Sequence, residues 1–323
     1  MSPLLRTWTR LTGAVVILAV LGWRLGTGPF LTGLHRVDAG ALLVAVLVTA
    51  VTTVCSAWRW RLVARGLGVD LPMRSAVPAY YRSQLLNVAL PGGVVGDVHR
   101  GVTHGRDAGD VGGGVRAVVW ERSAGQVVQI ALTVAVLLLL PSPVRPVVPA
   151  VAATLVVLGA TIALWVRTHP GDAHTYVSRV VRSVRSDLRH GVLARGTWPG
   201  VALASAVVVV GHTTAFVVAA RAAGVTTPLP RLLPLTLLVL AAMTVPTSIG
   251  GWGPREGAAA AVFGAAGLGA ATGVAAAVVY GVMVAVSTLP GLLVVLAAAR
   301  QRRPTAPLLA LRMPVAAAGE CDG

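Results

Sequence analysis

Residues 87–100 read Asn-Val-Ala-Leu-Pro-Gly-Gly-Val-Val-Gly-Asp-Val-His-Arg, and residues 245–256 read Val-Pro-Thr-Ser-Ile-Gly-Gly-Trp-Gly-Pro-Arg-Glu. Both stretches place a glycine five residues after a proline, and an arginine four residues after that glycine. The matching residues are Pro91, Gly96 and Arg100, and Pro246, Gly251 and Arg255. The flanking apolar segments are short, whereas a membrane-spanning helix needs about 20 apolar residues. Broken hydrophobic segments at corresponding positions of two halves are typical of transporter binding sites.

The chemistry of these stretches favours an anion site. Proline and glycine interrupt a helix and free backbone N–H and C=O groups, which in lipid must be buried in protein or line a wet cavity. A helix that restarts after the interruption presents unpaired N–H groups to an anion, and an arginine adds a guanidinium that suits phosphate or carboxylate. The alternative is that both stretches are glycine-rich surface loops and that their arginines lie at the ends of helices without a binding role.

We assign both stretches to a substrate-binding site. The assigned residues are Asn87, Pro91, Gly92, Gly93, Gly96, Asp97 and Arg100 in the first stretch, and Pro246, Ser248, Gly250, Gly251, Gly253, Arg255 and Glu256 in the second. Asp97 and Glu256 are expected to hold the two arginines in position, the alternative being that they bind and release protons. Asn87 and Ser248 are expected to form hydrogen bonds with the freed backbone or with a headgroup.

The composition indicates that most of the chain is surrounded by lipid and not by water. Of its 323 residues 55% are hydrophobic and only 12% are charged, whereas soluble domains carry about 25% charged residues. The net charge is +16, and all 27 basic residues are arginines. The positive-inside rule explains such an excess, and nucleic-acid binding is not expected because the sequence has no basic-aromatic platform.

The hydrophobic pattern predicts an all-α, polytopic membrane helix bundle. About six full spans are expected, over Leu11–Trp23, Ala39–Val63, Arg116–Leu140, a fourth segment ending near Val166, Trp198–Ala222 and Ala271–Ala298. Two re-entrant segments are expected near residues 76–104 and 232–269. Residues 1–303 would form one transmembrane domain and residues 304–323 a flexible tail. The first span is short and follows two arginines, and we expect it to be retained as a helix and not cleaved as a signal peptide.

Arginine distribution predicts the orientation of the chain. With the N-terminus inside, 20 of the 27 arginines face the cytoplasm and five face outside, which places both termini in the cytoplasm and the protein in the cytoplasmic membrane. The first broken stretch then approaches from the cytoplasm and the second from outside, so the two halves would be inverted repeats. Apolar residues between 172 and 190 recur with helical period, which predicts an amphipathic helix that lies on the lipid surface or packs on the bundle.

Glu121 and Arg122 lie inside the third predicted span. Intramembrane charges usually face a cavity or a partner. Adjacent residues point about 100° apart on a helix, so these two do not simply pair with each other. We expect Glu121 to meet an arginine of a broken stretch, Arg100 or Arg255. The alternative places both side chains at the headgroup level, shortly after Arg116.

The residues at the end of the second span are interpreted as an interfacial anchor. They are Trp58, Arg59, Trp60 and Arg61.

At these positions the sequence resembles the transmembrane region of lysylphosphatidylglycerol synthases, a flippase-like family of integral membrane proteins. The resemblance covers about residues 10–298. It rests on Arg82 and Asn87 before Leu90-Pro91, on Gly96-Asp97 with Arg100, on Glu121-Arg122 with Gly125, and on Pro246 to Glu256. Arg82 joins the candidate site on this ground. The sequence departs from the resemblance at Glu121, where many relatives are expected to have aspartate, one methylene shorter.

The resemblance implies a protein that moves, or helps to move, a lipid between leaflets. Full-length synthases continue into a cytoplasmic aminoacyltransferase domain, and the residues beyond Arg303 are too few to form one. We therefore expect a translocase for a lipid with an anionic, phosphate-bearing headgroup, with no catalytic residue, cofactor or metal. A P-loop is excluded because the sequence has no lysine.

Two other functions stay open from sequence alone. The chain would either be a non-catalytic membrane partner of a lipid- or glycan-modifying enzyme, or an intramembrane enzyme that acts on a lipid-linked substrate. The expected ligands are membrane lipids, and no oligomeric state is predicted.

Overall fold

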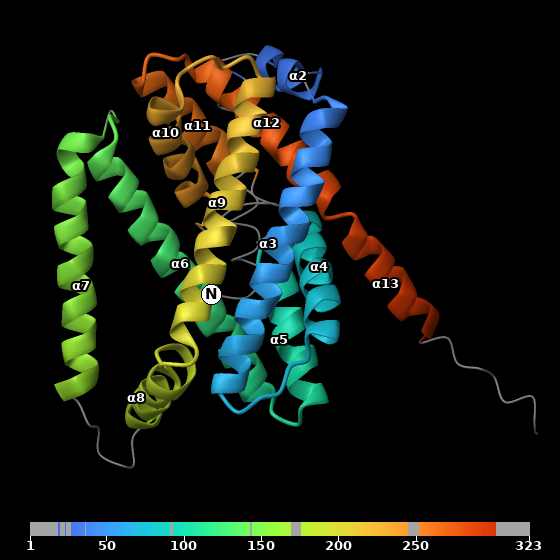
Figure 1. Cartoon of the computed structure of the whole chain (residues 1–323), viewed down its shortest axis with the longest axis vertical. Helices are drawn as coiled ribbons and strands as arrows, with labels where there is room; N and C mark the ends of the chain where they lie inside the picture. Colours follow the sequence, from blue (N-terminus) through green and yellow to red (C-terminus); the bar gives the residue numbers. More distant parts are fainter. Residues whose placement is uncertain are drawn as a thin grey trace, which may run out of the picture.

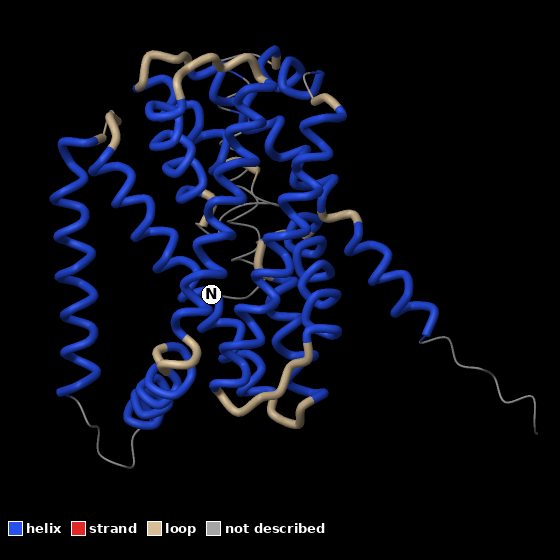
Figure 2. Tube along the Cα trace, in the orientation of Figure 1, coloured by secondary structure: helices blue, strands red, loops and turns tan. Residues whose placement is uncertain are grey.

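The computed structural model describes residues 19, 23, 27–35, 37–90, 93–142, 144–168, 176–244 and 252–301. These residues form helices joined by short turns and contain no β-strand (Figure 2). The helices are α2 (Gly28–His35), α3 (Ala39–Gly66), α4 (Met73–Ala89), α5 (Val95–Asp107), α6 (Val111–Leu139), a 3-10 turn (Arg145–Val147), α7 (Val148–Thr168), α8 (Tyr176–Ser186), a π-helical segment (Asp187–Val192), α9 (Trp198–Ala222), α10 (Leu229–Ala242), α11 (Pro254–Ala265), α12 (Ala270–Ser287) and α13 (Pro290–Gln301).

Five helical stretches are long and apolar enough to cross a membrane. They cover Ala39–Gly66, Val111–Leu139, Arg145–Ile162, Trp198–Ala222 and Ala270–Ala297. These stretches coincide with the second to sixth predicted spans, and the polytopic helix bundle is confirmed. Most of the first predicted span and all of the predicted tail lie outside the described residues.

The last predicted span is not one helix. The predicted span covers residues 271–298, and within it α12 ends at Ser287 and α13 begins at Pro290. Proline has no N–H for a helical hydrogen bond, and its ring disfavours the helical conformation of the preceding residue. The Thr288 N–H still donates to the Val284 carbonyl at 3.1 Å, and the chain turns after it. Hydropathy alone misses this break because the residues on both sides of Pro290 are apolar.

Short polar residues fix the starts of the two longest helices. The Asp38 carboxylate accepts a hydrogen bond from the Ala41 N–H at 2.7 Å, and the Asp110 carboxylate accepts one from the Gly113 N–H at 2.8 Å. Such N-caps satisfy backbone donors that a helix leaves unpaired. At the start of α11, Gly253 has a φ of 97°, which glycine adopts without steric cost.

Helices α3 and α9 form the centre of the bundle and pack side by side in opposite directions (Figure 1). In Figure 1, α3 descends, α4 ascends, α5 descends and α6 ascends, whereas α9 ascends, α10 descends, α11 ascends and α12 descends. The helices in residues 39–139 therefore run opposite to their counterparts in residues 198–287. This is the arrangement that an inverted repeat predicts, and the repeat relation itself stays a prediction.

Both short helices that follow a broken stretch pack inside the bundle. Helix α5 packs against α4 and α6, and α11 packs against α10 and α12. Glycines permit this close approach: a Cβ on Gly114 of α6 would lie 2.6 Å from the Gly105 Cα of α5, and a Cβ on Gly273 of α12 would overlap the Ala259 carbonyl of α11. The parts of the two stretches that belong to α5 and α11 are therefore packed helix, whereas residues 91–92 and 245–251 lie outside the described residues.

The predicted amphipathic segment forms α8 and the π-helical turn after it. Its C-terminal part packs on the bundle: Arg116 pairs with Asp187 at 3.2 Å, and the Trp120 indole N–H donates to the Asp187 carboxylate at 3.0 Å. This supports packing at that end. Contact of the remaining surface with lipid stays a prediction.

Candidate substrate-binding site

The Glu121 carboxylate is fully buried in α6 and is held by arginines from two other helices. Its Oε2 accepts a hydrogen bond from Arg100 Nη2 at 2.5 Å, and its Oε1 accepts one from Arg59 Nε at 2.8 Å. The Tyr80 hydroxyl donates to the same Oε1 at 3.3 Å. The predicted contact between Glu121 and an arginine of a broken stretch is confirmed, and that arginine is Arg100. The depth of Glu121 in the membrane stays a prediction.

Arg100 lies between two aromatic rings. Its guanidinium carbon is 4.6 Å from the Trp60 ring centroid and 4.4 Å from the Tyr80 ring centroid. Its Nε donates to Asp97 Oδ1 at 3.0 Å. Cation–π contacts strengthen where water is excluded, so these rings and two carboxylates together stabilise a charge that is only 1% exposed.

Asp97 joins the broken stretch to α4 and α6. Its carboxylate accepts hydrogen bonds from Ser83 Oγ and Asn87 Nδ2, each at 3.0 Å, and it pairs with Arg122. The Asn87 carbonyl oxygen accepts the Gly96 N–H at 2.8 Å. The predicted contacts of Asn87 with freed backbone and of Asp97 with Arg100 are therefore confirmed, and the choice between a positioning and a proton-binding role for Asp97 stays open.

The second broken stretch forms a similar cluster around Arg255. Arg255 Nη2 donates to Glu256 Oε1 at 2.6 Å, and Glu256 Oε2 accepts the Gly253 N–H at 2.7 Å. The Arg255 guanidinium carbon lies 4.7 Å from the Trp252 ring centroid and 5.8 Å from the Tyr280 ring centroid. Each broken stretch thus supplies an arginine that lies against a tryptophan and a tyrosine and pairs with carboxylate.

Glycines on the neighbouring helices leave room for the arginines. A Cβ on Gly125 of α6 would lie 2.6 Å from Arg59 Nη1, and a Cβ on Gly281 of α12 would collide with the Arg255 guanidinium. The absence of a side chain at these positions lets a large planar cation enter a helix interface.

We call Arg59, Asp97, Arg100, Glu121 and Arg122 the central cluster. A polar cavity of about 200 Å³, the central cavity, opens beside it between α3, α4, α6 and α9. Its polar lining residues are Ser56, Arg59, Tyr80, Gln84, Arg122, Gln126, Gln129, Ser205 and His212. The Arg122 side chain is 44% exposed although its helix is apolar enough to span a membrane. A charged group at such a position requires a partner or a water-filled space, and the cavity provides that space.

His212 connects this cavity to the second arginine cluster. Its Nδ1 is 3.0 Å from the Tyr280 hydroxyl, and the Tyr280 ring is one of the two beside Arg255. On the opposite side of the cavity, Arg59 Nη1 donates to Ser205 Oγ at 3.0 Å. Side chains from both halves of the chain therefore form one polar network.

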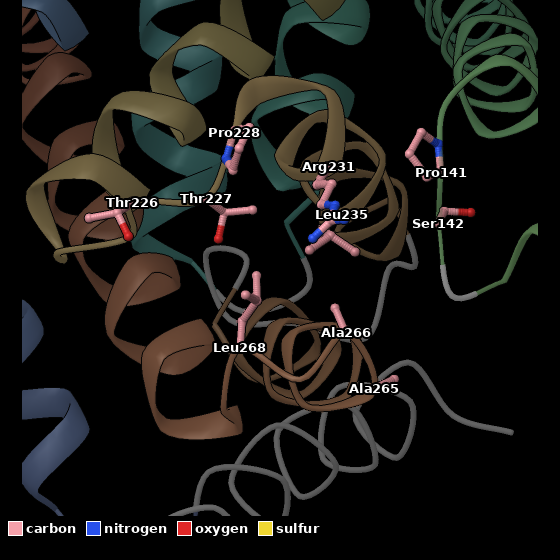
Figure 3. A pocket seen from close by; sticks show the side chains of 10 residues that line it. All are labelled: Pro141, Ser142, Thr226, Thr227, Pro228, Arg231, Leu235, Ala265, Ala266 and Leu268. Atoms are coloured by element: carbon pink, nitrogen blue, oxygen red, sulfur yellow. The ribbon is translucent and has the colours of Figure 1, made fainter.

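A second cavity, of about 550 Å³, lies where α6, α9 and α11 end and α10 begins (Figure 3). The Arg231 guanidinium and the Thr227 hydroxyl point into it. None of its described lining residues is acidic. It lies at the opposite end of the bundle from the packed end of α8 (Figure 1), and we call it the distal cavity.

The structure brings together many of the residues assigned from sequence. Asn87, Gly96, Asp97, Arg100, Glu121 and Arg122 form one cluster, and Gly253, Arg255 and Glu256 form the other. Gly93, with a φ of 61°, lies just before α5. Arg82 is partly buried on α4 and does not line the central cavity. Pro91, Gly92, Pro246, Ser248, Gly250 and Gly251 lie outside the described residues.

The interfacial-anchor interpretation is wrong for Arg59 and Trp60, which are 6% and 0% exposed. Aromatic and basic residues at the end of an apolar run look alike whether they face headgroups or a buried carboxylate. Sequence reasoning also missed most of the cavity wall. A usable signal was present, because Arg122, Gln126 and Gln129 have the i, i+4, i+7 spacing that places them on one face of α6.

The family described as lysylphosphatidylglycerol synthase TM region matches residues 9–302. A search of curated proteins finds no match.

Proposed function

The chain belongs to the lysylphosphatidylglycerol synthase TM-region family, and from that membership we propose that it translocates a lipid with an anionic, phosphate-bearing headgroup across the cytoplasmic membrane. The headgroup would occupy the central polar cavity while the acyl or prenyl chains stay in the hydrocarbon. The distal cavity would receive the headgroup at the other face of the membrane.

The observation that carries this proposal is the charge of the central cluster. Three arginines, Arg59, Arg100 and Arg122, face two carboxylates, Asp97 and Glu121. One positive charge is therefore unmatched in a region where charge is expensive. A phosphodiester carries one negative charge and would neutralise it.

The arginines would have different roles. Arg100, Arg122 and Arg255 all pair with carboxylates, but Arg100 and Arg255 are each only 1% exposed, so these two would position the broken stretches. Arg122 is half-exposed and lines the cavity together with Gln126 and Gln129. Its guanidinium would contact the phosphate, and the amides would bind headgroup hydroxyls.

Translocation in liposomes tests the proposal. Wild-type protein reconstituted with fluorescent phosphatidylglycerol should expose inner-leaflet label to an external quencher faster than empty liposomes do. Arg122→Gln should slow this exposure about tenfold, a factor that corresponds to about 1.4 kcal/mol. Arg74→Gln, at an exposed position on α4, is the matched control and should leave the rate unchanged.

The outcome against the proposal is a wild-type rate equal to that of empty liposomes with every lipid class tried. That result would leave the two alternatives, a membrane partner of a modifying enzyme and an intramembrane enzyme, both of which predict no lipid movement by the chain alone.

A further inference from the structure

We infer that His212 is a proton-binding group that makes occupation of the central cavity by an anion proton-coupled, so that an anionic lipid enters together with a proton. This inference rests on the proposed function and deepens it, because it names a co-substrate. It concerns a titratable side chain that the translocation proposal does not otherwise use.

The position of His212 suits this role. The residue lies on α9, at the centre of the bundle, and its ring lines the cavity. Within the described parts of the chain, Tyr280 is its hydrogen-bond partner, through Nδ1 at 3.0 Å. In the tautomer whose Nδ1–H donates to the Tyr280 hydroxyl, Nε2 carries no hydrogen and is the atom that would take a proton from cavity water.

The charges around His212 determine when the proton binds. The titratable and charged groups that line the cavity with it are Arg59 of α3, Tyr80 of α4 and Arg122 of α6. Glu121 of α6 lies behind Arg59 and Tyr80, and Arg255 of α11 lies behind Tyr280 of α12, the hydrogen-bond partner of His212. Arginines already outnumber carboxylates in this set. A protonated ring in the empty cavity would therefore add a second unmatched cation, and Coulomb repulsion opposes it.

An anion in the cavity changes the net charge around His212 so that it favours the protonated ring. A phosphate beside Arg122 neutralises the unmatched charge, so the protonated ring is then stabilised by attraction. Linkage makes the effect reciprocal, because proton binding must raise anion affinity by the same factor as anion binding raises proton affinity. The proton bound with the lipid would be released to water when the lipid leaves, and the transported pair carries no net charge.

Two measurements test the inference. In liposomes with equal pH on both sides, movement of fluorescent phosphatidylglycerol by wild type should rise about tenfold as the pH falls from about 8 to about 6. In weakly buffered solution, the purified full chain should take up to one proton per bound lipid when short-chain phosphatidylglycerol is added. A pH indicator in the solution measures this uptake. His212→Gln should abolish both the pH dependence of lipid movement and the proton uptake. His190→Gln, at an exposed position in the π-helical segment, is the matched control and should behave like wild type.

The outcomes separate this inference from the proposed function. Lipid movement that is independent of pH, with no proton uptake by wild type, overturns the inference and leaves the translocase standing. Absence of movement at every pH contradicts the translocase itself. If His212→Gln does not fold, His212→Asn and the wild-type proton-uptake measurement still decide.

Discussion

Glu121 is the residue on which the central cluster depends. Its two oxygens accept hydrogen bonds from Arg59, Arg100 and Tyr80, and its side chain has no exposure. Without a negative charge at this position, two buried guanidinium groups would lose their main partner. The stability of the fold and the architecture of the site therefore depend on the same carboxylate.

Glu121→Gln is expected to lower the free energy of unfolding by about 3–5 kcal/mol, the usual effect of removing one partner from a buried ion pair. Denaturant unfolding in detergent, followed by tryptophan fluorescence, measures this loss. Glu121→Asp keeps the charge and should lose much less, because only the reach of the carboxylate changes. Equal losses in the two variants would contradict the ion-pair explanation.

At the scale of a helix pair, α5 and α6 illustrate how small residues hold a short helix inside the bundle. Gly101 and Gly105 of α5 face Gly114 of α6, and the backbones touch there. A side chain at this interface has no space to occupy. Displacement of α5 would move Arg100 away from Glu121.

Gly114→Ala is therefore expected to destabilise the protein by about 1–3 kcal/mol, as overpacking of a close interface does, and to slow lipid movement. Thermal unfolding in detergent and the liposome assay measure the two effects. Gly159→Ala is the matched control, because Gly159 lies on α7 with nothing within 4 Å of the added Cβ. A Gly114→Ala protein as stable as this control would show that the interface tolerates a methyl group.

The sequence predicted the bounds of a helix well where hydropathy and flanking residues agreed. The bounds of α9 were predicted at Trp198–Ala222 and were found there, because Arg195-Gly196-Thr197 precede the apolar run and Gly224, with a φ of 90°, follows it. The break before Pro290 was missed because hydropathy stays high across it. The pairing of Arg100 with Glu121 was predictable because an intramembrane charge needs a partner. The participation of Arg59 and His212 was not predictable, since it depends on which helices pack together.

At the scale of the whole molecule, the antiparallel central pair of α3 and α9 sets the relation between the halves. The first broken stretch joins the ascending helix α4 to the descending helix α5, and the second joins the descending helix α10 to the ascending helix α11 (Figure 1). Each half places an arginine and two aromatic rings at the interior. Alternating exposure of one cavity to two sides is a common property of such architectures.

Single cysteines at Gly93 and Gly250, introduced after removal of Cys55 and Cys321, test this relation. A membrane-impermeant thiol reagent should reach the Gly93→Cys variant from the cytoplasmic side and the Gly250→Cys variant from outside. Labelling of both from one side would contradict the inverted arrangement. A cysteine at Arg195, in the turn before α9, is the control for the cytoplasmic side.

The interruption at Thr288 and Leu289 has a mechanical consequence. Helix α13 diverges from the line of α12 and packs on α4, and its Gly291 lies against the Tyr81 carbonyl (Figure 1). Helix α4 forms part of the cavity wall through Tyr80 and Gln84. Because α13 packs on that wall near Gly291, we expect a rearrangement that widens the cavity to displace the other end of α13, and a spin label at Ala297 would measure that displacement.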